Sequence, residues 1–123
     1  MFLNLCGPLK KVDDEYIAKF QPEEYRTSST NTIVPFFCAV EAMNQIVCRS
    51  SSIEYYDSKP AFPCQIINLH MSKHYQENCT YDSNLILKAT ISKKGEMSIG
   101  ECILTDTNGN EYAKETIWVT ERK

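Results

Sequence analysis

The segment from Phe36 to Cys48 contains neither glycine nor proline and is rich in residues that favour an α-helix. Pro35 stands just before it, at the first-turn position where helices tolerate proline. We therefore expect a helix over about residues 35–49, ended by the three serines at 50–52. Its apolar residues are Phe36, Phe37, Ala39, Val40, Ala42, Met43, Ile46 and Val47. A helix that is apolar nearly all round must be covered on most of its surface.

The remainder of the chain has the pattern of strands and turns. A short strand is expected over Tyr16 to Phe20, and the polar residues 27–32 are expected to form a loop. Beyond a loop that contains Pro63, the β-rich segments are residues 64–75, 84–92, 97–105 and 111–120. Tight turns at residues 93–96 and at Asn108-Gly109 join the last three segments, which therefore pair antiparallel as a meander.

The element order is thus one short strand, one helix and a strand meander over about residues 62–120. The economical way to cover a single apolar helix is a twisted sheet that wraps around it, which is the hotdog fold of the α+β class. We expect residues 1–123 to form one such domain, since a chain of this length buries a single core. The unpaired edges of the sheet favour edge-to-edge dimerisation into one continuous sheet.

Charge, hydropathy and cysteine spacing argue against several classes of function. The 13 basic and 16 acidic side chains give a net charge of −3 with no basic block, which argues against a nucleic-acid partner. No stretch approaches the ~20 apolar residues of a membrane span, and the N-terminus lacks the basic lead-in of a secretory signal. The six cysteines lie in apolar runs without C-x-x-C spacing. We therefore expect buried free thiols, no metal and no cofactor in a cytoplasmic protein.

Glu41 is the exception on the apolar helix. At about 100° per residue it shares one narrow stripe with Gln45 and Cys48, and Asn44 lies at the margin. A carboxylate on a helix otherwise dedicated to burial is costly unless it is paired, and desolvation favours its protonated form. A carboxylic acid kept partly protonated near neutral pH can act as a general acid. A solvent-facing stripe, or a place in a dimer interface, explains the same pattern without catalysis.

The helix motif resembles that of a known family. Residues 40–45, Val-Glu-Ala-Met-Asn-Gln, follow Ile33-Val34-Pro35 and are similar to the helix motif of the 3-hydroxyacyl-acyl carrier protein dehydratases, with Asn44 in place of an alanine. The Val-Pro step is also similar to the dehydratase-like proteins of aryl-polyene gene clusters. The residues that fit the family's third strand and following turn are Tyr75, Cys79, Tyr81, Asp82, Ser83 and Leu85. The resemblance spans about residues 13–120 and implies the same hotdog fold.

This resemblance implies a site that removes water from 3-hydroxyacyl thioesters. Glu41 would be the general acid that protonates the departing hydroxyl, and Gln45 would support it. Free amides at the helix N-terminus would stabilise enolate charge on the thioester. The binding residues would be Val34, Pro35, Phe36, Phe37 and Cys38. The family's catalytic histidine stands fourteen residues before the acid, where this chain has Thr27, whose hydroxyl is too poor a proton acceptor to replace it.

The missing histidine leaves three hypotheses for the function, ranked in this order. The first is a dehydratase of substrates carried by acyl carrier protein, in fatty-acid or polyene biosynthesis. It would work as a homodimer with an unusual base, or as half of a heterodimer with a paralogous hotdog subunit that keeps the histidine. His70 and His74, both expected on the strand before Tyr75, are the histidines from which such a base could come. The second hypothesis is a non-catalytic subunit that binds acyl chains or stabilises a partner, and the third is a thioesterase whose carboxylate activates water.

Overall fold

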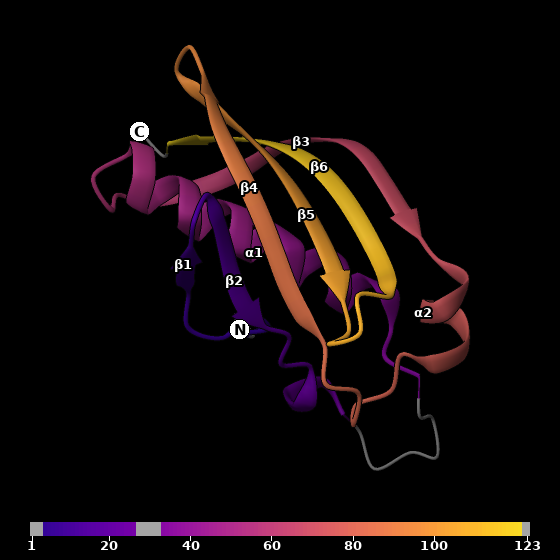
Figure 1. Ribbon diagram of the computed structural model, residues 1–123. Helices are drawn as coiled ribbons and strands as arrows, with labels where there is room; N and C mark the ends of the chain where they lie inside the picture. The colour runs from indigo at the N-terminus through magenta and orange to yellow at the C-terminus, as the bar shows by residue number, and fades with distance from the viewer. Residues whose placement is uncertain (1–3, 27–32, 122–123) are drawn as a thin grey trace.

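The computed structural model describes residues 4–26 and 33–121. One long helix, α1 (Phe36–Tyr55), lies against an antiparallel sheet of six strands in the order β1-β2-β4-β5-β6-β3. The strands are β1 (Lys10–Val12), β2 (Glu15–Lys19), β3 (Ala61–Met71), β4 (Ile86–Lys94), β5 (Met97–Thr105) and β6 (Glu111–Glu121). The other described elements are a 3-10 turn (Glu23–Tyr25) and the short helix α2 (Lys73–Asn78). In Figure 1, α1 crosses behind β4 and β5 and the sheet curves around it.

The sheet buries one face because side chains alternate along its strands. On β5 the buried residues include Ser98, Gly100, Cys102 and Leu104, and on β6 they include Ala113, Glu115, Ile117 and Val119. From α1 the core receives Cys38, Ala39, Ala42, Met43, Ile46 and Val47. The predicted meander is confirmed, since β4 pairs with β5 and β5 with β6, and β5 begins and ends at the predicted residues.

Gly100 lets α1 approach the middle of the sheet closely. A methyl group at this position would overlap the side chain of Val47 on α1. A glycine in a strand interior often marks such a close approach of another element. The position of the helix over β5 therefore depends on the absence of a side chain at residue 100.

The three serines at 50–52 do not end α1, so this expectation is wrong. The helix continues to Tyr55, and both buried serines within it have hydrogen-bond partners. Ser50 Oγ donates to the Ile46 carbonyl at 2.7 Å, within the helix itself. Ser51 Oγ lies 2.7 Å from Ser98 Oγ on β5. Serine weakens a helix mainly when its hydroxyl competes for the backbone, and here the hydroxyl of Ser51 is taken up by the sheet.

Strand β3 does not extend the meander, in contrast to the expected order over residues 62–120. It crosses to the far side of the sheet and pairs with β6, so that it forms an edge. Pro63 lies inside this strand rather than in a loop, next to a break in the pairing register. Proline lacks an N–H group, and edge strands and bulges are the places where a sheet tolerates it.

The chain turns into α2 directly after β3, where a continuing strand was expected. Ser72 caps this helix, and its Oγ accepts a hydrogen bond from the Tyr75 backbone N–H at 3.4 Å. His74 and Tyr75 therefore lie on a short helix, whereas His70 lies on β3 as expected.

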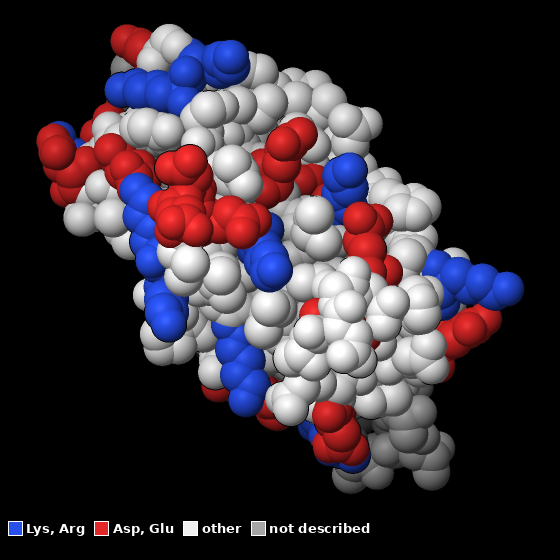
Figure 2. Space-filling model, viewed as in Figure 1, with Lys and Arg blue, Asp and Glu red and all other residues white. Residues whose placement is uncertain are grey.

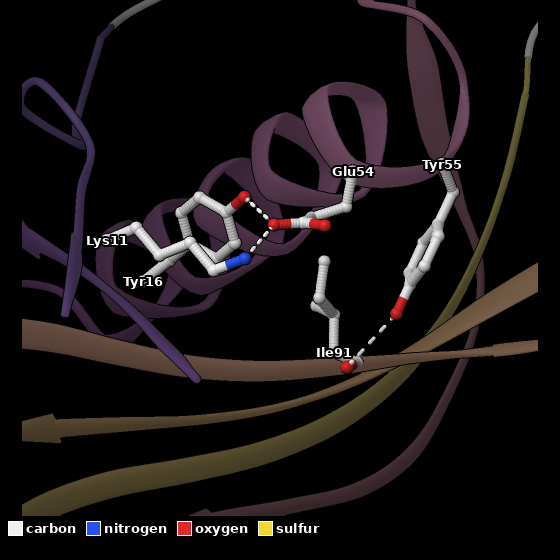
Figure 3. A network of polar contacts seen from close by, with 5 residues as sticks. All are labelled: Lys11, Tyr16, Glu54, Tyr55 and Ile91. Carbon is white, nitrogen blue, oxygen red and sulfur yellow. Dashed lines mark hydrogen bonds and ion pairs between the residues drawn. The ribbon is translucent and has the colours of Figure 1, made fainter. Parts of the chain in front are cut away.

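The C-terminal end of α1 is fastened to the first two strands, of which β1 was not expected. Figure 3 shows Lys11 of β1 and Tyr16 of β2 both donating hydrogen bonds to one carboxylate oxygen of Glu54. These hydrogen bonds lower the pKa of Glu54 below its ordinary value, and the one from Lys11 has the larger effect. Nearby, the hydroxyl of Tyr55 donates to the Ile91 carbonyl of β4 at 3.4 Å. Both contacts hold the last turn of α1 against the sheet.

Basic and acidic side chains are interspersed over the face of the molecule shown in Figure 2. The exposed residues of β5 and β6 contribute both signs, for example Glu101 and Lys114. Neither helix in the described part of the chain is long and apolar enough to span a membrane.

Candidate functional site

A pocket of about 720 Å³ lies between α1 and the first residues of β3. Its helical wall consists of Glu41, Asn44, Gln45, Cys48 and Arg49, and its other wall consists of Pro60, Ala61, Phe62 and Pro63. A second hollow shares four of these residues, continues along α1 to Ile53 and is also lined by Leu9 from the N-terminal segment. A concave, mostly apolar site with few polar groups is the usual form of a small-molecule pocket.

Glu41 lies half-buried in the helical wall of this pocket. The polar stripe that the sequence predicts on α1 is thus the side of the helix that faces the pocket. Its members recur every three or four residues, which brings Glu41, Asn44 and Gln45 onto one side. The carboxylate of Glu41 consequently lies in the same wall as the amides of Asn44 and Gln45 and the guanidinium of Arg49, opposite the apolar residues 60–63.

Gln45 and Arg49 also anchor the N-terminal segment to α1. Gln45 is 6% exposed, and its Oε1 accepts a hydrogen bond from the Leu5 backbone N–H at 3.0 Å. Arg49 donates from Nη1 to the Cys6 carbonyl at 2.8 Å and from Nη2 to Asn4 Oδ1 at 2.6 Å. These contacts give both residues a structural role at the pocket wall.

Glu115 is the residue of this region that the sequence analysis did not single out. It lies on the inner face of β6 and is 0% exposed. With the amide of Asn44 turned so that its nitrogen faces Glu115, Nδ2 lies 2.9 Å from Oε2 and 3.1 Å from Oε1. Burial, and then the negative charge of Glu41, raise the pKa of Glu115 to about 8. The signal in the sequence was a glutamate on the apolar face of an alternating strand, together with Ala113, Ile117 and Val119.

Cys48 completes the helical wall but is a poor nucleophile. Burial, and then the charge of Glu41, raise the pKa of its thiol to about 12. The thiolate is the reactive form of cysteine, so this thiol stays protonated and inert near neutral pH. The pocket therefore offers carboxyl, amide and guanidinium groups, and not a thiolate, for chemistry.

No protein family profile matches this chain, and no curated protein matches it in sequence. Solved structures do match. A sigma28-regulated virulence protein from Campylobacter jejuni superposes with a TM-score of 0.73 at 10% identity, covering 100% of this chain and 88% of that one. A thioesterase from Haemophilus influenzae gives a TM-score of 0.68 at 13% identity, covering 91% and 76%. Zebrafish thioesterase superfamily member 2 gives 0.65 at 12% identity, covering 92% and 78%.

The chain has the hotdog fold. This conclusion rests on one helix wrapped by an antiparallel sheet and on the hotdog thioesterases among the structural neighbours. At 10–13% identity the likeness concerns the fold alone. The dehydratase family suggested by residues 40–45 agrees with this fold, and the family itself stays a prediction.

The N-terminus of the hotdog helix is not part of the pocket that contains Glu41. Val34 and Cys38 are fully buried in the core, and the hydroxyl of Tyr75 donates to the Val34 and Pro35 carbonyls at 2.8 and 3.0 Å. Phe36 packs edge-to-face on Tyr75, with ring centroids 5.1 Å apart. Phe37 is 56% exposed and packs edge-to-face on Tyr25. The expected binding residues Val34, Pro35, Phe36, Phe37 and Cys38 are therefore not brought together with Glu41 in this pocket.

Neither histidine stands near the acid. His70 is exposed on β3, and His74 on α2 stacks on Tyr112 with ring centroids 5.7 Å apart. Neither of them lines the pocket with Glu41. Thr27, at the position of the family's histidine, lies outside the described residues.

The cysteines differ in burial more than expected. Cys64 on β3 is exposed and Cys48 is half-buried, while the other four are buried. The expectation that all six are buried is therefore wrong, because β3 forms an edge that neither layer covers. Within residues 4–26 and 33–121, no group of three or more potential ligands could hold a metal ion.

Proposed function

We propose that this hotdog protein binds acyl thioesters in the pocket beside Glu41 and hydrolyses them. The observation that carries the proposal is that Glu41 supplies the one carboxylate of this pocket. Neither His70 nor His74 lines the pocket beside it. Dehydration requires a base and an acid, whereas a single carboxylate can serve hydrolysis by moving one proton. The names of two structural neighbours, both thioesterases, support the same substrate class.

In the proposed reaction, the Glu41 carboxylate accepts a proton from water as the water oxygen attacks the thioester carbonyl carbon. The tetrahedral intermediate then collapses, its carbon–sulfur bond breaks, and Glu41 returns the proton to the departing sulfur. The products are a carboxylic acid and a thiol, with no change in oxidation state. The apolar residues at 60–63, and the hollow that continues toward Ile53, would accommodate the acyl chain.

The test is hydrolysis of acyl-coenzyme A thioesters of several chain lengths, followed by the release of free thiol. Glu41→Gln keeps the size of the side chain and removes the base, so kcat should fall by about 10²–10⁴-fold. Glu77→Gln, on the exposed part of α2, is the matched control and should leave kcat unchanged. Hydrolysis that survives Glu41→Gln, or a wild-type protein that releases no thiol, would refute the proposal.

A dehydratase is the second candidate, and the motif at residues 40–45 favours it. In this case the base would come from a paralogous subunit, or Thr27→His would restore it. The measurement is hydration of an enoyl thioester presented on acyl carrier protein or on coenzyme A, by the chain alone and after co-expression with such a paralogue. Hydration that appears only with the paralogue, and disappears with Glu41→Ala, would favour this candidate. A chain that binds acyl thioesters without either reaction would be the non-catalytic subunit.

We further propose that the partner is a second copy of this chain, paired through β3. This edge strand is exposed along its length, and its large apolar residues Phe62, Ile66, Ile67 and Leu69 are 40–45% exposed. One edge of β3 pairs with β6, and its other edge has no strand partner among the described residues. Long apolar edges of this kind are usually covered in native proteins. The strand carries no lysine, arginine, aspartate or glutamate, so two copies can lie side by side without charge repulsion.

A further inference from the structure

Asn44 connects the pocket to a carboxyl group that the pocket does not reach. Its side chain lines the pocket beside Glu41, and its amide also lies within hydrogen-bond distance of both oxygens of Glu115. Glu115 itself is absent from the pocket wall and is 0% exposed. One amide therefore touches the space for a ligand and, at the same time, a buried acid on the opposite layer of the fold.

Packing alone does not account for Glu115. Its neighbours on the inner face of β6 are apolar, and a buried carboxyl group costs free energy unless it is paired. The titratable groups that interact electrostatically with Glu115 are Glu41 and Cys48 from α1 and Cys102 from β5. Its β3 neighbour across the sheet is the apolar Leu69. None of these groups is a cation, so the uncharged form of Glu115 is the one that these surroundings favour.

We propose that Glu115 is a positioning residue for this pocket, which fixes the Asn44 amide beside Glu41 and does so in its protonated form. This inference rests on the proposed thioester chemistry of Glu41. A protonated carboxyl can accept a hydrogen bond from Nδ2 of the Asn44 amide or donate one to its Oδ1. An ionised carboxyl can only accept from Nδ2. The amide N–H that remains can donate to the thioester carbonyl oxygen as negative charge develops there.

Ionisation of Glu115 would disturb the site through its charge. It would add a second negative charge beside Glu41, while the Asn44 amide would keep its nitrogen toward Glu115. The added charge opposes the negative charge that develops on the substrate oxygen during attack by water. The rate of hydrolysis should therefore fall as the pH rises above the pKa of Glu115, which is about 8.

The test is the pH profile of kcat/KM for acyl-coenzyme A hydrolysis between about pH 6 and 10. The wild type should lose activity above pH 8, whereas Glu115→Gln, which is uncharged at every pH, should keep its neutral-pH activity up to pH 9. Asn44→Ala should lower kcat by about 10²-fold at pH 7, with a smaller effect on KM. Glu101→Gln, on the exposed face of β5, is the matched control and should follow the wild-type profile.

The side-chain amide signals of Asn44 in nuclear magnetic resonance spectra give a second measurement that does not need activity. They should titrate near pH 8 in the wild type and not in Glu115→Gln. An active wild type whose alkaline decline persists in Glu115→Gln, or an Asn44→Ala variant with wild-type kcat, would overturn the positioning role alone. A wild type without hydrolysis would overturn both this role and the proposed function, even if the amide signals titrate.

Discussion

Glu115 is a carboxyl group enclosed between α1 and the sheet, with the amide of Asn44 as its hydrogen-bond partner. Because burial raises its pKa from 4.5 to about 8, the folded protein holds a proton there that the unfolded chain releases at lower pH. The stabilisation that comes from this proton is fully present below about pH 4.5. It is lost as the pH rises toward 8, where the folded state must either ionise the group or unfold.

Glu115→Gln should therefore flatten the dependence of stability on pH. At pH 5 the variant and the wild type should unfold at similar urea concentrations. At pH 9 the variant should be more stable by roughly 3–5 kcal/mol, from about 1.4 kcal/mol per pKa unit. Urea unfolding at pH 5, 7 and 9 measures this difference, with Glu101→Gln as the exposed control. Parallel profiles for the wild type and Glu115→Gln would contradict the buried, protonated state of Glu115.

Helix α1 packs against strand β5 through the close approach of Val47 to Gly100. Gly100→Ala places a methyl group against the side chain of Val47, and overpacking of this kind costs about 1–3 kcal/mol. Val47→Ala by itself should also destabilise the protein, because it leaves a cavity. In the double variant the new methyl group occupies part of that cavity.

The double variant Gly100→Ala with Val47→Ala should consequently be more stable than the sum of the two single changes implies. A double-mutant cycle from urea unfolding should give a coupling free energy of about 1–2 kcal/mol. Strictly additive effects would mean that α1 does not rest on β5 at this point.

At the scale of the whole molecule, β3 is an apolar edge strand that the protein's own two layers leave exposed. If a second copy covers it, one lysine in the middle of the strand should separate the two copies. Ile66→Lys places a charge at the centre of β3, where its partner copy would lie. Thr90→Lys places the same charge on an exposed position of the central strand β4 and serves as the control.

Light scattering combined with size-exclusion chromatography should give twice the mass of one chain for the wild type and for Thr90→Lys. Ile66→Lys should give the mass of a single chain. A wild type that is monomeric alone, but that co-purifies with a paralogous hotdog subunit, would replace the homodimer with the heterodimer. A monomer with and without such a subunit would reject both assemblies.

The sequence predicts where α1 begins and that β4, β5 and β6 pair antiparallel. These features follow from periodicities of about 3.6 and 2 residues and from short turns, which depend on neighbours in the chain. It also placed Glu41, Gln45 and Cys48 on one side of the helix, because helical spacing is local.

Tertiary contacts set how far α1 extends, where β3 lies, and which group meets Asn44. Ser51 stays helical because Ser98, 47 residues away, takes up its hydroxyl. Strand β3 pairs with β6 rather than with its successor in the chain, since sheet order depends on contacts between distant segments. Glu115 meets Asn44 across two layers, and no local pattern in either segment records that contact. Such contacts form only when elements far apart in the sequence pack together, so no short stretch of the sequence specifies them.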